Sequence, residues 1–284
     1  MSERGSVASS DLAFTDADFR VISQYAAQRY GLDIKTEKKG LIYARLARRI
    51  RTLGLPDFKA YCDLATGPQS ADEAEELLSA LTTNVSSFYR ERHHFESLSK
   101  TILPALRDKS DRGELRIWSA GCSSGQEPYT IAATVKDCWP DARLANVSIL
   151  ATDVDPRILD KARAATYRAT EAASLSPEQR DRLFQTGPRG ADTVTVKPEL
   201  RKMVTFDRIN LVGDWRHSAP FDVIFCRNVV IYFERTTQHR LWQRFRDTLA
   251  PDGHLFIGHS ERLTGPAETK FRNIGITAFA KIAS

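Results

Sequence analysis

A short glycine-containing loop and two carboxylates give the first indication of chemistry. The loop, residues 121–125, follows an apolar run over 115–120 and leads into Glu127, and Asp153 ends a second apolar run. Strand, glycine loop and helix form the opening unit of nucleotide-binding α/β domains, in which an acid at the end of the second strand binds ribose hydroxyls. We therefore predict that Glu127 and Asp153 contribute to a cofactor site.

The spacing of the loop favours one kind of ligand. Gly121 and Gly125 form neither the dinucleotide pattern G-x-G-x-x-G nor a P-loop, because no Lys-Ser/Thr pair follows. An acid at the start of the next helix favours hydroxyl and ammonium groups over a polyphosphate, and S-adenosylmethionine (SAM) carries such groups without phosphate. The alternative for the loop is a tight turn without a ligand. Asp153 or Asp155 could instead cap the helix that begins near Pro156, and we assign that role mainly to Asp155.

The composition is that of an ordinary globular chain. Of 284 residues, 42% are apolar and 27% charged, and the net charge of +5 is too small to establish nucleic-acid binding. No apolar run approaches the roughly 20 residues that span a bilayer, and residues 1–10 lack an apolar signal core, so we expect a cytoplasmic protein without membrane insertion. The cysteines form no C-x-x-C pair, which predicts buried thiols in a reducing compartment and no metal site: Cys62, Cys122, Cys138 and Cys226.

The N-terminal part is predicted to be helical. A flexible tail over 1–11 precedes an all-α domain over 12–81, with Thr15 as a helix cap and Gly31 as a helix end. One helix of this domain has an apolar inner face and a basic outer region, formed by Arg45, Arg48, Arg49 and Arg51. Two readings of this region are open: a solvated helix face, or a docking surface for an acidic partner.

The remainder is predicted to be an α/β domain. A polar joint over 82–92 leads into residues 93–284, in which strands alternate with helices. The alternation is interrupted at about 174–205, where we expect a small β insertion with strands at 194–196 and 203–206. The last strand, 275–282, is expected to lie antiparallel in the sheet. This predicts a Rossmann-like sheet with a β-subdomain, preceded by the all-α domain.

A further buried strand, 221–226, supplies two more candidates. Arg227 and Asn228 follow its C-terminal end, which is where open α/β sheets bind their ligands, and Tyr232 lies in the loop beyond. His93 and His94 begin a helix and diverge by about 100° on it, so they are a poor metal pair.

Five strings in register resemble the chemotaxis-receptor methyltransferase family (CheR) over nearly the whole chain after residue 12. They are TTNVSSFYRE at 82–91, WSAGCSSGQEPY at 118–129, ATDVD at 151–155, IFCRNVVIYF at 224–233 and GHSE at 258–261. The resemblance implies methyl transfer from SAM to glutamate side chains on the cytoplasmic helices of chemoreceptors. The products are glutamyl methyl esters and S-adenosylhomocysteine.

The resemblance also implies a role for each matching residue. Arg90 and Tyr232 are implied to lie near the reacting methyl group. Ser86 stands where a threonine is frequent and keeps the hydroxyl, and Gln126 stands where a glutamate is frequent. The residues implied to contact SAM are Asn84, Ser86, Arg90, Glu127, Asp153, Asn210, Leu211, Arg227 and Asn228.

The implied reaction needs no general base. A glutamate side chain is already ionised at neutral pH, because its unperturbed pKa is about 4.3. The sulfonium is already activated, so the step is an in-line displacement with the carboxylate oxygen about 3–3.5 Å from the methyl carbon. Arg90 and Tyr232 are expected to orient that carboxylate through hydrogen bonds. Tyr232 could instead act as an aromatic lid on the adenosyl group.

The resemblance favours the docking reading of the basic helix, because receptor methylation helices carry many glutamates. Arg45, Arg48, Arg49 and Arg51 are then expected to bind the cytoplasmic helical bundle of a chemoreceptor. Some family members bind a receptor's C-terminal pentapeptide through a G-x-G turn in the insertion. The turn here, 185–191, reads QTGPRGA and lacks that pattern, which predicts a tether-independent enzyme.

Three other functions compete with this one. A nucleic-acid methyltransferase would suit the basic pI, but the chain has no N-P-P-Y-type motif and no stacking aromatics within the basic stretch. A non-catalytic SAM-sensing adaptor would not need to keep Arg90, Glu127, Asp153 and Tyr232. A nicotinamide oxidoreductase is disfavoured by the missing G-x-G-x-x-G.

Overall fold

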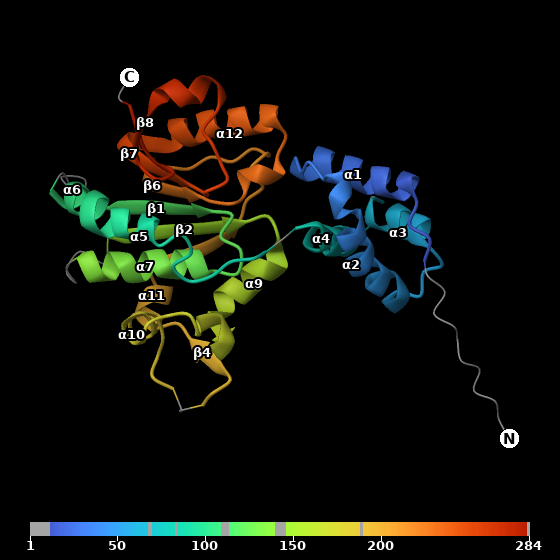
Figure 1. Ribbon diagram of the computed structural model, residues 1–284, viewed down its shortest axis with the longest axis horizontal. Helices are drawn as coiled ribbons and strands as arrows, with labels where there is room; N and C mark the ends of the chain where they lie inside the picture. Colours follow the sequence, from blue (N-terminus) through green and yellow to red (C-terminus); the bar gives the residue numbers. More distant parts are fainter. Residues whose placement is uncertain are drawn as a thin grey trace. The chain divides into compact units, whose positions relative to one another are not determined.

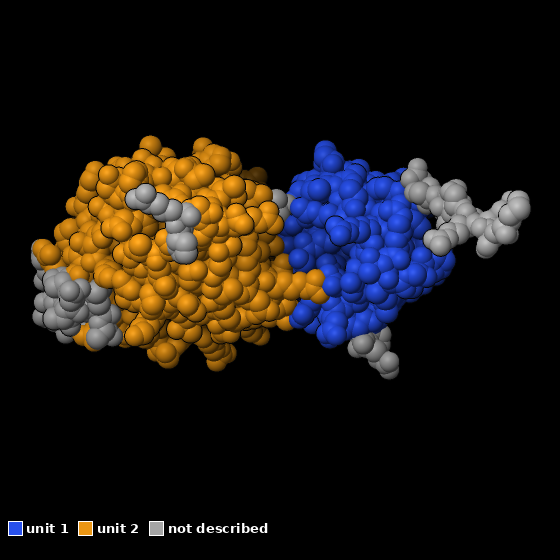
Figure 2. Space-filling view, turned by 90° about the horizontal axis from the view of Figure 1, so that it is seen from below, with its two compact units in different colours: residues 1–83 blue, residues 84–284 orange. Residues whose placement is uncertain are grey.

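The computed structural model describes residues 12–67, 70–82, 84–108, 114–139, 146–187 and 190–282. The chain forms two compact units, residues 1–83 and 84–284 (Figure 2). The tail expected over 1–11 lies outside the described residues. No helix among the described residues is long and apolar enough to cross a membrane.

Unit 1 is helical, in agreement with the sequence. Thr15 caps the first helix through a capping box with Asp18, and Gly31 ends it in the left-handed conformation. Ile22, Leu46 and Tyr61 are fully buried members of one apolar core. The elements are α1 (Asp16–Tyr30), η1 (Thr36–Lys38), α2 (Lys39–Thr52), α3 (Phe58–Ala65) and α4 (Ala71–Leu81).

Unit 2 is built on a seven-stranded sheet with the order β5-β2-β1-β6-β7-β9-β8 (Figure 1). The five strands from β5 to β7 are parallel, whereas β9 is antiparallel to both of its neighbours. This confirms the predicted α/β class. The strands are β1 (Leu115–Ala120), β2 (Val147–Asp153), β5 (Val204–Arg208), β6 (Phe221–Cys226), β7 (Leu249–Ile257), β8 (Phe271–Gly275) and β9 (Ala278–Lys281).

Two strand assignments from the sequence are wrong in part. The strand expected at 203–206 belongs to the main sheet, where β5 pairs with β2, and not to the insertion. The small sheet instead pairs β3 (Thr166–Arg168) with β4 (Thr193–Thr195), so the insertion's sheet begins before residue 174. The expected antiparallel final strand is confirmed as β9, the second arm of the β8–β9 hairpin. Strand pairing is non-local, and the apolar pattern of 203–206 fits either sheet.

Helices cover both faces of the main sheet. Ile117, Ile149 and Phe225 lie on the face that packs against the segment from 93 to 108 and helix α7. Trp118 points to the opposite face, where its ring lies 5.4 Å from that of Phe245 in α12. Burial on both faces explains why these strands are continuous apolar runs. The helices are α5 (His93–Ser97), the π-helical turn η2 (Leu98–Ile102), α6 (Leu103–Asp108), α7 (Gln126–Cys138), α9 (Pro156–Ala164), η3 (Ala169–Ala172), α10 (Pro177–Leu183), α11 (Pro198–Arg201), η4 (Val230–Tyr232), α12 (Arg235–Thr248) and η5 (Gly265–Lys270).

Candidate functional site

The sheet topology brings the predicted residues to one edge. Strand β1 lies between β2 and β6, and the strand order reverses at β1 and β6, which makes this the switch point where open α/β sheets bind ligands. The glycine loop follows β1, Asp153 ends β2, and Arg227 follows β6. Because parallel strands end at the same edge, these residues surround one site.

Neighbouring side chains leave no room for a Cβ atom at the two loop glycines. Gly121 and Gly125 have φ angles of 82° and 91°, in the left-handed region that favours glycine. A Cβ at Gly121 would lie 2.3 Å from Cγ2 of Val229, and one at Gly125 would lie 2.9 Å from the Tyr167 hydroxyl. The sequence predicted glycines that admit a ligand. The structure adds a second reason, which is the close approach of the loop after β6 and of strand β3.

Asp153 is oriented by main-chain donors. Its carboxylate accepts from the backbone N–H of Ser123 at 2.9 Å and of Asp155 at 3.1 Å. The side chain is almost buried, and this burial raises the pKa of Asp153 above its usual value. These hydrogen bonds fix the carboxylate while leaving acceptor capacity for a hydroxyl donor.

Asp155 has the capping role that the sequence predicted. Its Oδ1 accepts from the backbone N–H of Arg157 at 3.0 Å, in the first turn of α9. Its Oδ2 accepts from the Asn84 side-chain amide at 3.2 Å. The predicted cofactor residue Asn84 is therefore tied to the end of β2, next to Asp153.

Glu127 and Arg227 form a buried ion pair. Arg227 Nε donates to a Glu127 carboxylate oxygen at 2.8 Å, and the Ser119 hydroxyl donates to the other oxygen at 2.7 Å. The Arg227 side chain is only 3% exposed. Both residues were predicted to contact SAM. The structure shows in addition that they connect the helix after the glycine loop to the end of β6.

Arg227 also reaches the joint. Its Nη1 donates to the carbonyl oxygen of Arg90 at 2.7 Å and to His94 Nδ1 at 2.9 Å. The His94 Nε2–H is then directed at the Ile276 carbonyl, 3.1 Å away. Burial and the adjacent guanidinium lower the pKa of His94 to about 3, so this imidazole is neutral.

Glu91, His93 and His94 lie close enough together to resemble metal ligands. The Glu91 carboxylate also contacts His259 Nδ1 at 3.1 Å. However, the Arg227 guanidinium already donates to the His94 nitrogen that faces this group. A metal ion here would have to displace or lie beside a buried cation, which is electrostatically unfavourable.

Arg90 and Tyr232 are both half-buried. Arg90 Nη1 donates to the Val85 carbonyl at 2.8 Å, which curls the joint around its side chain. The residues on either side of Arg90 have positive φ angles of 53° at Tyr89 and 55° at Glu91. Left-handed backbone at non-glycine residues is uncommon and clusters at functional sites. Tyr232 ends the single turn η4, six residues after β6.

Three further predicted residues differ in accessibility. Leu211 is buried, and its carbonyl accepts from Trp215 Nε1 and Arg244 Nη1, both at 2.9 Å. Asn210 is half-buried, and its Oδ1 accepts from the Val212 amide at 3.2 Å. Ser86 is half-buried in the joint. Leu211 is thus held firmly near the start of the connection between β5 and β6.

Glu261 was not predicted as a site residue. It is 3% exposed, and its carboxylate accepts hydrogen bonds from the backbone of the loop that carries Asn228 and Tyr232. The only sequence signal for it was its place in the string GHSE at 258–261.

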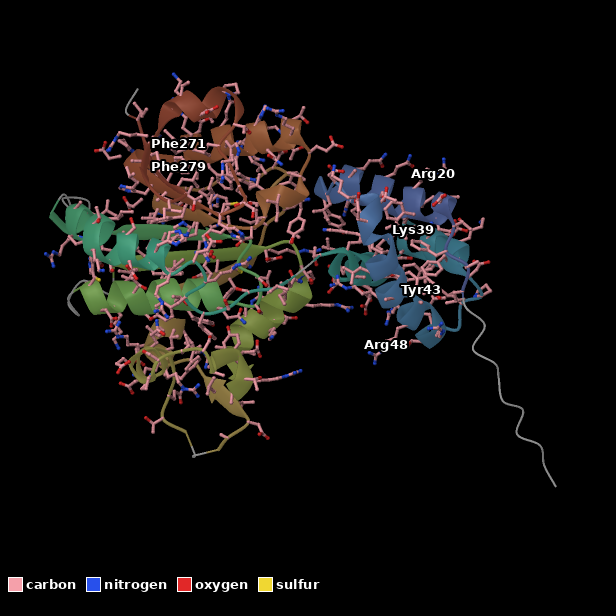
Figure 3. All side chains as sticks on the ribbon, viewed as in Figure 1. Arg20, Lys39, Tyr43, Arg48, Phe271 and Phe279 are labelled. Carbon is pink, nitrogen blue, oxygen red and sulfur yellow. The ribbon has the colours of Figure 1, made fainter. Side chains whose placement is uncertain are left out.

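The four arginines of α2 do not form one exposed face. Arg45 donates to the carbonyls of Ala80 and Thr82, at 2.8 and 2.7 Å, and Arg49 forms an ion pair with Glu73 at 2.7 Å. Arg48 and Arg51 are exposed, and Figure 3 shows Arg48 projecting from the helix. Two of the four predicted docking residues, Arg45 and Arg49, are therefore engaged within unit 1, where they hold α2 against α4 and the segment after it.

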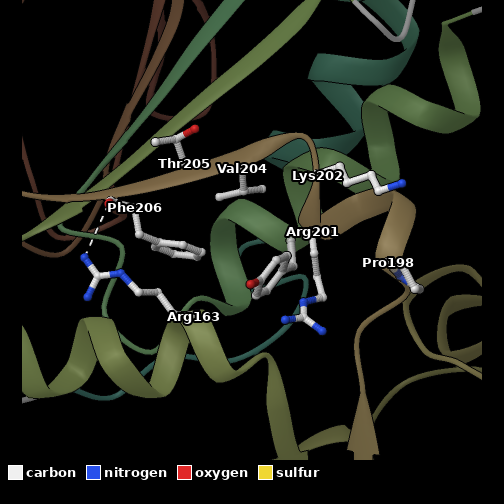
Figure 4. A pocket seen from close by; sticks show the side chains of 8 residues that line it. Arg163, Pro198, Arg201, Lys202, Val204, Thr205 and Phe206 are labelled. Atoms are coloured by element: carbon white, nitrogen blue, oxygen red, sulfur yellow. Dashed lines mark hydrogen bonds between the residues drawn. The ribbon is translucent and has the colours of Figure 1, made fainter.

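An open pocket of about 530 Å³ lies elsewhere on unit 2 (Figure 4). None of the predicted cofactor residues lines it. Arg163 donates there to the Phe206 carbonyl at 3.3 Å. The guanidinium of this lining residue is thus already hydrogen-bonded within the protein. Its lining residues are Tyr129, Arg163, Pro198, Arg201, Lys202, Val204, Thr205 and Phe206.

Comparison with known proteins gives matches over both units. Residues 84–280 match the family described as "CheR methyltransferase, SAM binding domain", and residues 17–82 match "CheR methyltransferase, all-alpha domain". The chain is 45% identical over 251 residues to the probable chemotaxis protein methyltransferase of Rhizobium etli, covering 88% of this chain and 94% of that protein. It is 42% identical over 274 residues to the chemotaxis protein methyltransferase of Escherichia coli, covering 95% and 92%. For the protein of Salmonella typhimurium, the identity is 43% over 258 residues, covering 89% and 86%.

Proposed function

Because the chain belongs to the CheR methyltransferase family, we propose that it methylates glutamate side chains of a chemoreceptor with SAM as the methyl donor. The family match covers the SAM-binding domain and the all-α domain, and the relatives are matched over most of their length. The enzyme is a SAM-dependent methyltransferase, and its products are a glutamyl methyl ester and S-adenosylhomocysteine.

The cofactor is assigned to the switch point of the sheet. The observation that carries this assignment is Asp153, a nearly buried carboxylate at the end of β2 that two backbone amides orient. A carboxylate in this position accepts hydrogen bonds from ribose hydroxyls. Asn84, Ser86, Asn210, Leu211 and Asn228 are proposed to complete the contacts with SAM.

Glu127 and Arg227 are proposed to contact SAM, and each also holds the other in position. Their ion pair is shielded from water and braces the start of α7 against the end of β6. An Arg227 guanidinium fixed in this way also holds the backbone of Arg90. Contact with SAM would therefore use acceptor or donor positions that the pair leaves open.

Arg90 and Tyr232 are proposed to orient the methyl-accepting carboxylate. That carboxylate is ionised at neutral pH and attacks the methyl group in line, so no proton has to be removed. The Arg90 guanidinium supplies a charge-assisted hydrogen bond, and the Tyr232 hydroxyl supplies a neutral one. Strong stabilisation would weaken the nucleophile, so their contribution is orientation.

The partner is proposed to be the cytoplasmic helical bundle of a chemoreceptor, with the enzyme acting in the cytoplasm. Residues 12–81 are proposed as the docking domain, with Arg48 and Arg51 as the exposed cations of α2. Glutamate-rich methylation helices complement such a surface. Two residues of the 185–191 turn lie outside the described part of the chain. The absence of G-x-G in its sequence supports tether independence.

The test is methyl transfer from labelled SAM to a purified chemoreceptor cytoplasmic fragment. Label that becomes volatile methanol after alkali identifies a carboxyl methyl ester and supports the proposal. A matched receptor fragment with the acceptor glutamates replaced by alanine should take up no label. Label that survives alkali would point to another acceptor group and contradict glutamate methylation.

A further inference from the structure

Glu261 lies buried at the centre of a cluster of backbone amides. Its Oε1 accepts from the N–H groups of Val229 at 2.9 Å, Val230 at 2.7 Å and Ile231 at 3.3 Å. Its Oε2 accepts from Asn228 at 3.0 Å and from Gly258. Four consecutive amides after β6 thus converge on one carboxylate.

Converging amides of this kind usually form a site for an external anion. Here the anion is part of the chain, and all five of these donors are backbone N–H groups. Burial raises the pKa of Glu261, while the hydrogen bonds to Gly258, Asn228, Val230 and Ile231 oppose that shift. The carboxylate is therefore held by oriented dipoles, which fixes the shape of the loop.

The loop turns through a left-handed residue where it leaves the sheet. Asn228 has a φ angle of 59°, in the left-handed region. Gly258 lies so close that a Cβ there would be 2.7 Å from the Asn228 nitrogen and 2.5 Å from its Nδ2. The turn containing Gly258 and Glu261 is thus fitted against Asn228. Asparagine adopts this conformation more readily than most residues, and the fit against Gly258 and the hydrogen bond to Glu261 hold it here.

We propose that Glu261 is a positioning residue for methyl transfer, because its carboxylate fixes the loop that presents Asn228 and Tyr232 to the reaction site. The loop joins the end of β6 directly to η4, so its conformation determines the position of the Tyr232 backbone and therefore of its side chain. This inference rests on the role proposed above for Tyr232. Glu261 itself touches backbone amides and acts only through the loop.

The direct test compares Glu261→Gln with the native enzyme. Glutamine keeps the volume but turns one acceptor oxygen into a donor, which then faces backbone N–H groups. We expect kcat with the receptor fragment to fall about 100-fold, the loss that misplacement by about 1 Å can cause. Amide hydrogen exchange at 228–231 should accelerate in the folded protein. Glu268→Gln makes the same change at an exposed glutamate and should alter neither quantity.

A double-mutant cycle separates positioning from general stability. If Glu261 acts through Tyr232, then Glu261→Gln combined with Tyr232→Phe should have a kcat no lower than that of the more damaged single variant, within about threefold. Effects that multiply in full would overturn the positioning of Tyr232 by Glu261. So would near-normal turnover of Glu261→Gln when Tyr232→Phe is defective.

Two further variants distinguish the role of Glu261 from the role proposed for Tyr232. Near-normal turnover of Tyr232→Phe alone would overturn the role of Tyr232 and, with it, the coupling to Glu261. If Glu261→Gln does not fold, Glu261→Asp retains the charge with a shorter reach. That variant should show a cooperative thermal unfolding transition and a kcat below that of the native enzyme. Full native activity in it would contradict the proposal.

Discussion

The guanidinium of Arg227 lies between two parts of the site that are far apart in the sequence. Its Nε is 2.8 Å from the Glu127 carboxylate, and its Nη1 is 2.7 Å from the Arg90 carbonyl oxygen. Arg227 therefore links the helix after the glycine loop, the end of β6 and the joint. Arg90, which is proposed to orient the acceptor, is thus hydrogen-bonded to an ion pair that is proposed to lie beside the cofactor.

The first prediction concerns this ion pair. Replacing Arg227 with methionine leaves the Glu127 carboxylate buried without its charged partner, which is strongly destabilising. We expect the free energy of unfolding to fall by about 3–5 kcal/mol. Urea denaturation monitored by tryptophan fluorescence measures this. Arg182→Met removes an arginine from a more exposed pair with Asp137 and should cost less than about 1 kcal/mol. Equal losses in the two variants would contradict the buried-pair argument.

The second prediction concerns SAM affinity. Asp153→Asn removes the charge that is proposed to accept the ribose hydroxyl, and hydrogen bonds to charged groups contribute about 1.5–3 kcal/mol. We expect the Kd for SAM, measured by calorimetry, to rise about 10- to 100-fold. Asp160→Asn makes the same change at an exposed carboxylate of α9 and should leave the Kd unchanged. The assignment of the ribose to Asp153 would be lost if the two variants bound SAM equally well.

The third prediction separates catalysis from cofactor binding. Arg90→Ala removes the guanidinium that is proposed to orient the acceptor carboxylate, while the backbone of residue 90 still accepts from Arg227. We expect kcat to fall by about 100-fold or more, with a change in SAM affinity of less than about tenfold. Arg90→Lys keeps the charge without the planar fork and should recover only part of the rate. Near-normal turnover of Arg90→Ala would contradict a role of Arg90 in orienting the acceptor.

Local patterns predicted much of this architecture. The strand, glycine loop and helix around Gly125 and the capping roles of Thr15 and Asp155 depend on residues within a few positions of one another. Such features follow from backbone sterics and unsatisfied helix N–H groups. The common edge for Asp153 and Arg227 followed from the rule that parallel strands end together.

Partners that are distant in the chain could not be predicted in this way. Arg227 and Glu127 are 100 positions apart, and their pairing depends on the order of β1 and β6. Periodicity placed Arg45 outside unit 1's core but gave no sign that the carbonyls of Ala80 and Thr82 would bind it. Glu261 resembles any glutamate in a loop until the fold brings five amides to it.

The fourth prediction is a pH dependence of stability. His94 is neutral in the folded protein because burial and Arg227 lower its pKa to about 3, whereas the unfolded chain has the ordinary value of about 6.5. The unfolded state therefore binds one more proton between these values. The resulting stabilisation is fully present above pH 6.5 and is lost as the pH falls towards 3.

Denaturant titrations between pH 6.5 and 5 test this contribution. In His94→Asn, a carbonyl oxygen replaces Nδ1 as the acceptor for Arg227 and does not titrate. The slope of unfolding free energy against pH should be shallower than in the native protein by up to about 1.4 kcal/mol per pH unit. Glu91, whose pKa is lowered, contributes mainly below this range. Identical slopes would show that His94 is protonated in the folded state.

The fifth prediction concerns receptor docking. Arg48 and Arg51 are exposed, so reversing both charges should weaken attraction to a glutamate-rich receptor helix without disturbing the core of unit 1. We expect kcat/KM for a receptor fragment to fall about tenfold or more at low ionic strength, with SAM affinity and the unfolding midpoint unchanged. The difference from the native enzyme should shrink as salt is added, because exposed charges are screened over about 8–10 Å near physiological ionic strength.

Arg45 supplies the matched comparison on the same helix. Its guanidinium already binds the Ala80 and Thr82 carbonyls. Arg45→Glu would place a carboxylate against these acceptors, so its main effect should be a lower unfolding midpoint. The docking role belongs to the exposed pair if Arg48→Glu/Arg51→Glu loses kcat/KM at an unchanged midpoint. Unaltered receptor methylation by that double variant at low salt would remove α2 from the docking surface.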